Sequence, residues 1–514
     1  MSETLDTATL DALAEHFDAV LLDVGNTLVV EAEPGTPVGE LVPEPLPGVV
    51  EAVRHLASRR RVGAVTNAAV MREADVRALL ARVDLDRHLD VVVTSADAGA
   101  AKPDPRPLTL ALERLGVAPA RALFVGDRAA DEAAAAAAGT AFRATDAGLV
   151  DALVRAVVSR EGAFANAAAG IRALDEDAVH AAARRQGVLT KPSGSLGRLE
   201  QIAAQLCGIA GRCPAPVPTR PAVAVFAADH GVAASGVTPW PQTVTAQMVA
   251  NFAAGGAAIN VIARQVGAAV RVVDVGVAGD LGDVAGVEDR RVRPGTADLS
   301  VGPAMTARDA RAALDAGAEV AAALVADGYD LLLTGDMGIG NSTASAALIG
   351  ALTGRPAADV TGRGSGIDDA MLDRKTAVVA GATERVAGYL DPTSVLAAIG
   401  GLEIAAIAGF AVGGAAAGVP VVVDGLIALA GVVVGAALVP DLPARCIAGH
   451  RSTEPGATVA LDHLALAPVL DLELRLGEGT GACLAVPLVQ AAARTLAEIA
   501  TFEDAAVDRG PAMP

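Results

Sequence analysis

The chain has 514 residues, a length that suggests two to four domains. Hydrophobic residues make up 52% of it but aromatic residues only 2%, so we expect interiors built from Ala, Val and Leu with closely packed backbones. The formal net charge of −20 argues against nucleic acid as a partner, because binding phosphates requires basic surfaces. Four cysteines have neither metal-ligand nor redox spacing, and we expect reduced, buried thiols in a cytoplasmic protein: Cys207, Cys213, Cys446 and Cys483.

Two uncharged stretches, 404–423 and 425–440, could be mistaken for membrane spans. They are rich in Gly and Ala, and Asp424 separates them. We interpret them as a buried helix, a buried strand and a second buried helix, with a transmembrane segment as the alternative. The acidic N-terminus, residues 1–16, lacks the basic segment and the apolar run of a signal peptide. We therefore expect no membrane partner.

Apolar runs in the first part of the chain alternate with helical patterns, which predicts a parallel sheet covered by helices. The runs cover residues 17–22, 62–65, 91–93 and 122–125. Because ligands bind at the carboxyl ends of parallel strands, we expect the side chains that follow these runs to converge on one site. Carboxylates with one Lys and one Thr suit a magnesium ion and a phosphoryl group. These residues are Asp23, Thr66, Lys102, Asp127 and Asp131.

In this order, the five residues resemble the motifs of the haloacid dehalogenase-like hydrolases, and the resemblance covers about residues 1–158. It implies a Rossmann-like α/β fold in which Asp23 is the nucleophile. It also implies that Thr66 and Lys102 bind the phosphoryl oxygens. A Mg²⁺ ion would be held by Asp23, Asp127 and Asp131.

One position departs from the pattern of that family. Gly25 stands where its phosphatases usually carry the general acid that protonates the leaving alcohol. Loss of a general acid slows expulsion of a poor leaving group by roughly 10²–10⁴-fold. The domain is therefore a weak hydrolase, a hydrolase for substrates with better leaving groups, or a fold that has lost the reaction. The segment after the first motif is short and Pro-rich, so we expect a small cap and an open site.

We place a linker at residues 159–170, and a new helical pattern begins near Ile171. A second domain, residues 171–514, follows. Four further apolar runs, each ending in an acid or a glycine, are separated by helical patterns. They predict a second parallel sheet covered by helices, with a crevice at one edge. The runs cover residues 222–228, 270–273, 331–333 and 420–423.

The segment 335–343, Gly-Asp-Met-Gly-Ile-Gly-Asn-Ser-Thr, follows an apolar run and opens an Ala-rich helix. Backbone N–H groups at a helix start, with glycines that permit close approach, form an anion site. The segment lacks the lysine of a Walker loop and the spacing of a dinucleotide fingerprint. The phosphate of a mononucleotide fits it. A second Gly-rich loop, 361–366, precedes Lys375, which is either a second contact for that phosphate or a surface lysine.

Glu478 lies between two glycines, just before another apolar helix pattern. On its own, this arrangement is either a solvated turn or a carboxylate that backbone without side chains brings close to a ligand. The rest of the second domain favours the second interpretation.

Five motifs of the second domain, in order, resemble the nicotinate-nucleotide:dimethylbenzimidazole phosphoribosyltransferase family. They are KPSGSLGRLE at 191–200, ADHGV at 228–232, VTAQMVANFAAGGAAINV at 244–261, GDMGIGN at 335–341 and EGTGA at 478–482. The resemblance implies an α/β phosphoribosyltransferase domain with a small helical subdomain. It also implies transfer of ribose 5-phosphate from nicotinate mononucleotide to 5,6-dimethylbenzimidazole during cobalamin assembly. The products are α-ribazole 5′-phosphate and nicotinate.

The same resemblance implies roles for individual residues. Glu478 is the general base that removes the ring N–H proton of the benzimidazole. Asp336, often Glu in the family, is catalytic or orders its loop. The phosphate and ribose are held by Gly338, Ile339, Gly340, Asn341 and Lys375, and the benzimidazole pocket is lined by Gln247 and Leu476. No cofactor or metal is implied for the transfer, and we expect a homodimer.

Two histidines, His230 and His450, lie near glycines at strand or loop ends, and we interpret both as structural or ribose-side contacts. The adjacency of the domains leaves three hypotheses open. The first domain removes phosphate from α-ribazole phosphate or another phosphomonoester, or it is a catalytically silent interaction module. Alternatively, the second domain binds a nucleotide as a sensor without turnover, which the presence of Glu478 argues against.

Overall fold

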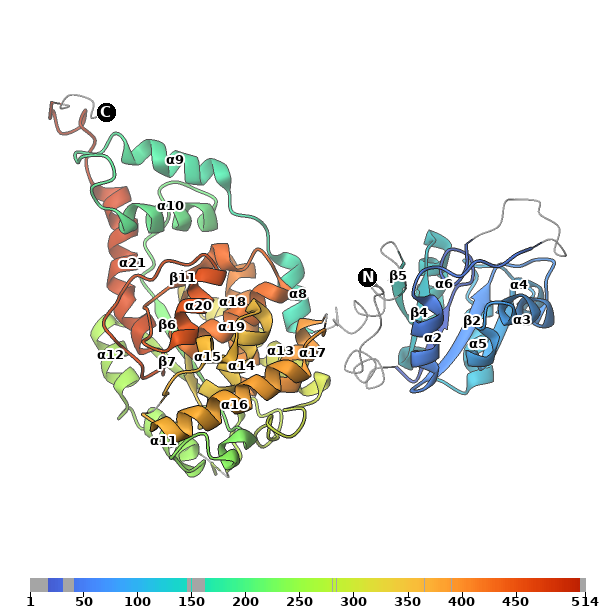
Figure 1. The fold of residues 1–514 in the computed structure, drawn as a ribbon. Helices are drawn as coiled ribbons and strands as arrows, with labels where there is room; N and C mark the ends of the chain where they lie inside the picture. Colours follow the sequence, from blue (N-terminus) through green and yellow to red (C-terminus); the bar gives the residue numbers. More distant parts are fainter. Residues whose placement is uncertain are drawn as a thin grey trace. The chain divides into compact units, whose positions relative to one another are not determined.

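The structure, a computed structural model, divides into two compact units, the first of which ends near Ser159 (Figure 1). The residues that it describes are 17–30, 41–145, 149, 162–279, 281–282, 284–364, 366–389 and 391–508.

The first unit contains a five-stranded sheet in the order β3-β2-β1-β4-β5, and every described pair of strands is parallel. The strand order reverses between β1 and β4, which is where ligands bind in open sheets of this kind. All four predicted strands are confirmed, and β5 was not predicted. The strands are β1 (Ala19–Leu22), β2 (Arg61–Thr66), β3 (Val91–Thr94), β4 (Ala122–Gly126) and β5 (Ala141–Ala144).

Helices of the first unit cover the sheet, so its central strands are buried on both faces and can be continuously apolar. Every residue of β1 is buried. Helix α5 packs on β2 and β3, and α6 packs on β4 and β5. The helices are α2 (Val49–Ala57), α3 (Glu73–Ala81), α4 (Ser95–Ala98), α5 (Arg106–Leu115) and α6 (Ala129–Ala138).

The second unit contains a six-stranded parallel sheet in the order β11-β10-β9-β6-β7-β8. The chain builds β6, β7 and β8 toward one edge and then β9, β10 and β11 toward the other. The reversal therefore lies between β6 and β9. The predicted strands are confirmed, and β8 and β11 are additional. The strands are β6 (Pro221–Ala228), β7 (Ala269–Gly276), β8 (Val287–Asp289), β9 (Leu331–Met337), β10 (Val421–Val423) and β11 (Cys446–Ala448).

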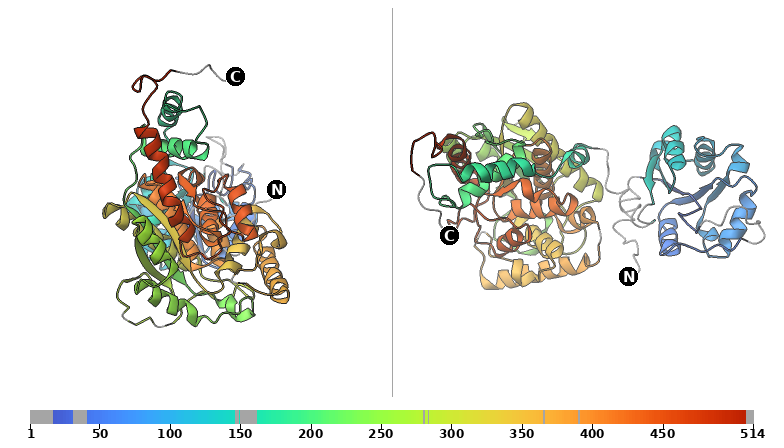
Figure 2. Two further views of the ribbon diagram at one scale, coloured as in Figure 1. Left: turned by 90° about the vertical axis from the view of Figure 1, so that its left-hand side faces the viewer. Right: turned by 90° about the horizontal axis from the view of Figure 1, so that it is seen from above.

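The helices around this sheet include a small group at one end, where α9 and α10 pack together and against α21. Both views of Figure 2 show α9 and α10 beside one end of α21. The principal helices are α8 (Ala163–Gly170), α9 (Glu176–Gln186), α10 (Arg198–Ala210), α11 (Thr243–Ala253), α12 (Ala258–Val266), α13 (Ala307–Ala326), α14 (Asn341–Thr353), α15 (Ala357–Val360), α16 (Asp369–Arg385), α17 (Pro392–Ile399), α18 (Leu402–Ala416), α19 (Leu426–Leu438), α20 (Pro455–His463) and α21 (Thr480–Glu498).

The prediction of closely packed backbones is confirmed where α13 and α18 cross. A Cβ atom added at Gly317 would lie 1.8 Å from the Ala406 carbonyl oxygen, and one added at Gly409 would lie 1.9 Å from the Leu314 carbonyl oxygen. The two backbones thus come closer than any side chain between them would allow. Such contacts help to fill a core in a chain that has few large aromatic side chains.

The uncharged stretches form a buried helix, a buried strand and a second buried helix, as predicted. They are α18, β10 and α19. Elsewhere, the described stretches Thr243–Val266 and Thr480–Glu498 are long and apolar enough to cross a membrane by length and composition. This is weak evidence for a span, because core helices have the same composition, and the first stretch is broken between α11 and α12.

The connection between the domains differs from its prediction. Part of the stretch predicted as a linker is helix α8, which packs on α13 and α18. The next helix begins at Glu176 rather than near Ile171, because the Asp175 side chain accepts a hydrogen bond from the Ala178 N–H and caps α9. Residues 150–161 lie outside the described part of the chain.

Candidate functional site

The first unit brings its predicted site residues together at the carboxyl edge of the sheet. Asp23 follows β1, and Asp131 lies in the first turn of α6 beyond β4. The Lys102 Nζ atom is 2.5 Å from Asp23 Oδ1 and 2.6 Å from Asp131 Oδ1. Carboxylate oxygens of Asp23, Asp127 and Asp131 lie within 4.8 Å of one another. The geometry is therefore that of a compact acidic site neutralised in part by one lysine.

Lys102 is positioned by the end of β2. Its backbone N–H donates to Asn67 Oδ1 at 2.8 Å, and the Asn67 side-chain amide donates to the Lys102 carbonyl at 3.0 Å. The Lys102 ammonium also donates to the Val65 carbonyl at 3.1 Å, next to the half-buried Thr66. Thr66 thus borders the same site. The positioning role of Asn67 was not predicted, since it depends on a contact with a residue far away in sequence.

The residues of this site fit a magnesium ion. Three carboxylates offer the hard oxygen ligands that Mg²⁺ prefers, and the exposed Asp127 leaves an approach from solvent. Burial raises the pKa of Asp23 to about 6, although the Lys102 ammonium acts to lower it. A cation bound beside Asp23 would lower this pKa again.

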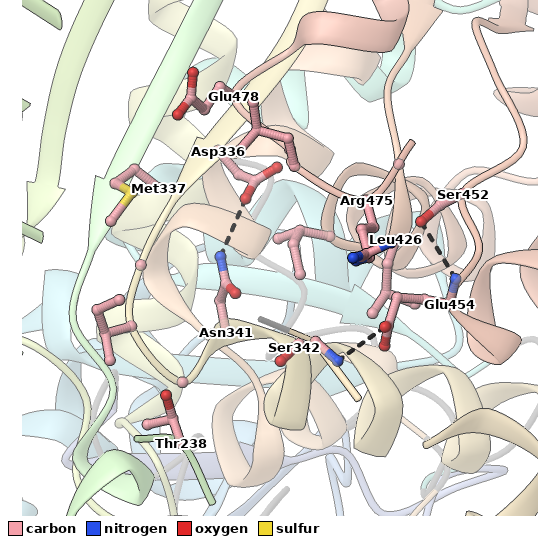
Figure 3. Close-up of a pocket in the computed structure, with 18 of the residues that line it drawn as sticks. Thr238, Asp336, Met337, Asn341, Ser342, Leu426, Ser452, Glu454, Arg475 and Glu478 are labelled. Atoms are coloured by element: carbon pink, nitrogen blue, oxygen red, sulfur yellow. Dashed lines mark hydrogen bonds between the residues drawn. The ribbon is translucent and has the colours of Figure 1, made fainter. Parts of the chain in front are cut away.

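The second unit has a cavity of about 740 Å³ beyond the carboxyl ends of β9 and β10 (Figure 3). It lies beside the reversal of strand order, where a crevice is expected. Its lining combines polar and charged groups with an apolar wall. The predicted site residues that line it are Asp336, Gly338, Ile339, Gly340, Asn341, Lys375, Leu476 and Glu478.

One part of the cavity suits an anion. The loop at Gly338 passes so close to β6 that a Cβ atom there would lie 2.3 Å from the Ala228 carbonyl oxygen, so only glycine fits. Helix α14 begins directly after this loop, at Asn341. Its N-terminus carries the partial positive charge of the helix dipole. This loop and helix start therefore line the cavity with the backbone of an anion site.

Lys375 lies at the same part of the cavity, and it is buried rather than a surface lysine. Its Nζ atom donates to Ser342 Oγ and to the Gly362 carbonyl, each at 3.0 Å. Burial lowers the pKa of Lys375 to about 8, while the Glu454 carboxylate acts to raise it. The Gly364 N–H donates to Glu454 Oε1 at 2.8 Å, so Glu454 fixes the Gly-rich loop around Lys375. The role of Glu454 was not predicted.

Glu478 is held on a strained backbone. Gly477, Glu478 and Gly479 have φ angles of 81°, 64° and 90°, and the middle one belongs to a residue with a Cβ atom. The Ile259 N–H donates to Glu478 Oε2 at 3.2 Å. Burial raises the pKa of Glu478, the Ile259 hydrogen bond opposes this, and the nearby Asp424 raises it further. A carboxyl group with a raised pKa in a cavity wall is suited to accept a proton.

Asp424 holds the loop that carries Glu478. This fully buried carboxylate accepts hydrogen bonds from the Gly479 N–H at 3.2 Å and the Ala482 N–H at 2.9 Å. It therefore caps the start of α21, which begins two residues after Glu478. The His450 Nε2 atom lies 3.5 Å from Asp424 Oδ1. Although burial lowers the pKa of His450, Asp424 raises it above its usual value.

Asp336 lines the same cavity as Glu478. Its Oδ2 atom accepts a hydrogen bond from the Asn341 side-chain amide at 3.1 Å, as Figure 3 shows. Burial and the neighbouring carboxylates, Asp424 first among them, raise the pKa of Asp336 well above its usual range. The shift is toward the protonated carboxyl, which can donate as well as accept a hydrogen bond.

The second unit is similar in sequence and structure to known phosphoribosyltransferases. A phosphoribosyltransferase family model matches residues 171–507. The nicotinate-nucleotide–dimethylbenzimidazole phosphoribosyltransferase of Salinispora tropica is 52% identical over 354 residues, which cover 66% of this chain and 97% of that protein. A solved structure of the Thermus thermophilus protein of that name is 49% identical, with a TM-score of 0.63, and its whole length matches 66% of this chain.

The chain belongs to the nicotinate-nucleotide–dimethylbenzimidazole phosphoribosyltransferase family.

Because two thirds of the chain accounts for the whole of that Thermus thermophilus relative, the rest has no counterpart in it. A separate family model, that of the haloacid dehalogenase-like hydrolases, matches residues 10–139. The protein is thus a phosphoribosyltransferase with a haloacid dehalogenase-like domain before it.

One residue predicted from the family pattern, Gln247, is not among the residues that line the cavity. It is exposed on α11, whereas Val244 and Met248 of the same helix line the cavity. His230 is fully buried, with Nε2 2.7 Å from Glu403 Oε1, which fits the structural role expected for it. His450 lines the cavity of this phosphoribosyltransferase.

Proposed function

We propose that the second unit transfers ribose 5-phosphate from nicotinate mononucleotide to 5,6-dimethylbenzimidazole, giving α-ribazole 5′-phosphate for cobalamin assembly. The observation that carries this proposal is one cavity that holds the buried Glu478 together with Lys375 and the Gly338 loop. A mononucleotide phosphate at Lys375 leaves the rest of the cavity to the acceptor. The names of relatives that this chain covers almost completely support the same pair of substrates.

Glu478 accepts the ring N–H proton of the benzimidazole in this mechanism. The other ring nitrogen attacks the anomeric carbon from the face opposite nicotinate, and a new C–N bond forms. The bond from that carbon to the pyridinium nitrogen breaks, and its electron pair goes to the departing ring. Nicotinate leaves without needing a proton, so a single general base is enough. Asp336 lines the same cavity and would form a hydrogen bond with a ribose hydroxyl.

Incubation of the purified protein with both substrates tests the transfer. Nicotinate release that depends on dimethylbenzimidazole, with matching formation of α-ribazole 5′-phosphate, is the expected result. The Asp23→Asn variant serves as control, because its site lies in the other unit and its transfer rate should be unchanged. Absence of benzimidazole-dependent release would contradict the proposal.

A second function is favoured by the acidic site of the first unit. We propose that it removes phosphate from a phosphomonoester, with α-ribazole 5′-phosphate as the first candidate because the other unit produces it. Asp23, Asp127 and Asp131 would hold Mg²⁺, which neutralises charge on the transferred phosphoryl group. Thr66 and Lys102 would bind the phosphoryl oxygens, and Asp23 would attack the phosphorus atom.

Phosphate release from α-ribazole 5′-phosphate in the presence of magnesium tests this second function. The release should disappear in Asp23→Asn and persist in Glu478→Gln. With Gly25 at the usual position of the acid, we expect faster release from aryl phosphates, whose alcohols leave without protonation. A wild-type protein that releases phosphate from neither kind of ester would instead be evidence for a silent interaction module.

A further inference from the structure

His450 is enclosed between two glycines at the wall of the transferase cavity, and its side chain is buried. A Cβ atom added at Gly481, in the first turn of α21, would lie 1.9 Å from His450 Cδ2, so only glycine fits there. A Cβ atom added at Gly425 would lie 3.3 Å from His450 Nε2. The Gly449 N–H donates to the Val423 carbonyl at 2.8 Å, which holds the neighbouring backbone against β10. The imidazole therefore lies directly against the start of α21, the helix whose preceding loop carries the proposed base.

Asp424 links this imidazole to the loop of the base. Its Oδ1 atom is 3.5 Å from His450 Nε2, which is long for a hydrogen bond. The N–H groups of Gly479 and Ala482 donate to Asp424 at 3.2 Å and 2.9 Å and hold it in place. His450 thus contributes a charge beside Asp424 rather than a contact that fixes its position.

The Asp424 charge acts on three groups around it. Burial raises the pKa of Glu478, and the Asp424 charge adds to that effect. The pKa of Asp336 is raised well above its usual range, first by burial and next by Asp424. Burial lowers the pKa of His450, but Asp424 contributes most to a net upward shift. A charged imidazole is therefore favoured beside Asp424, and it opposes the effect of Asp424 on the two carboxyl groups.

Other charged groups also surround His450. Asp471 acts on the imidazole as well, but it is 65% exposed and lies 3.4 Å from Arg451 Nε, so solvent and that guanidinium weaken its effect. Asp424 is fully buried and is therefore screened less, which makes it the stronger partner of His450. The remaining charged residues that line the cavity are Asp336, Arg363, Lys375, Glu454, Glu473, Arg475 and Glu478.

We propose that His450 is a positioning residue for the general base, and that its charge, paired with Asp424, keeps Glu478 ionised at the pH of the reaction. This inference rests on the proposed transferase function. A charged imidazole offsets the field of Asp424 at Glu478, so the base ionises at a lower pH than it would beside an unpaired Asp424. His450 acts through Asp424 and needs no contact with either substrate.

The pH dependence of kcat in His450→Gln tests the assignment. Glutamine keeps an N–H donor near Asp424 but carries no charge. We expect the acid limb of the kcat profile to move to higher pH by about one unit. Well down that limb kcat should fall about tenfold, and on the plateau, where Glu478 is ionised in both proteins, it should stay close to that of the wild type. The KM for nicotinate mononucleotide should not change.

His463→Gln is the matched control, because His463 is an exposed histidine of α20 outside the cavity lining, and it should leave the profile unchanged. Thermal unfolding checks that each variant is folded, and the smaller His450→Asn replaces a glutamine variant that is not. An acid limb that stays in place, or failure of both variants to fold, would assign His450 a purely structural role and overturn the inference, while the proposed function stands. If the wild-type protein itself transfers no ribose phosphate to dimethylbenzimidazole, the proposed function is wrong.

Discussion

Glu478 is the side chain on which the proposed transfer depends most. Glu478→Gln keeps the size of the residue and an acceptor for the Ile259 N–H, but it removes the basic carboxylate. We expect kcat to fall by about 10²–10⁴-fold, the usual contribution of a general base. The KM for nicotinate mononucleotide should change little, since the phosphate is bound elsewhere. Initial rates of nicotinate release measure both constants, and a rate near that of the wild type would place the base on another residue.

The pKa shifts of Glu478 and Lys375 predict how the transfer depends on pH. The raised pKa of Glu478 means that the base is protonated and inactive at acidic pH, so kcat should rise with pH on that side. Lys375, with a pKa lowered to about 8, loses its charge as pH rises through that value. The KM for nicotinate mononucleotide should therefore increase as the pH rises through that range. Lys375→Arg should remove this alkaline increase, because arginine stays charged.

Residues at strand ends could be predicted from the sequence, and their supporting contacts could not. Asp23 follows an apolar run directly and Asp336 comes three residues after one, so the rule that sites form at carboxyl ends identified both. Glu454 carries no such local signal, because its role follows from a partner distant in sequence, the loop at Gly364.

Helix α21 owes the position of its first turn to Asp424. In Asp424→Asn, the amide oxygen would still accept from one of the two backbone N–H groups, but the NH₂ group would face the other, and that hydrogen bond would be lost. We expect the free energy of unfolding of the second unit to fall by about 1–3 kcal/mol and the transfer rate to fall with it. Thermal unfolding and nicotinate release measure the two effects. Asp175→Asn, which exchanges one good N-cap for another on α9, should change neither.

Strands with long apolar runs were predicted correctly, and short strands at or near the edges were missed. β8 and β11 have three residues each, and the four residues of β5 include Arg143. Such segments carry too little hydrophobic pattern to be recognised, and pairing with a neighbour defines them. The buried pair α18 and α19 was predicted correctly because Asp424 and the surrounding glycines separate two helices that are each too short to cross a membrane.

The two units are expected to function separately. All described residues that line the transferase cavity belong to the second unit, and a Thermus thermophilus relative consists of that part alone. A chain that begins at residue 162 should therefore retain the wild-type kcat and both KM values, and it should release no phosphate from α-ribazole 5′-phosphate. Assays of the truncated chain beside Asp23→Asn measure this. A loss of transfer in the truncated chain, but not in Asp23→Asn, would assign the first unit a supporting role.

The depth of Lys375 has a consequence for the order of events in the whole protein. With Lys375 only 1% exposed, a phosphate bound to it is enclosed by the transferase cavity. The phosphatase step proposed for the first unit acts on the same phosphate group. We therefore expect the intermediate to be released from one unit before the other acts on it. In a coupled reaction from labelled nicotinate mononucleotide, added unlabelled α-ribazole 5′-phosphate should fully dilute the label in the final α-ribazole, whereas undiluted label would reveal channelling.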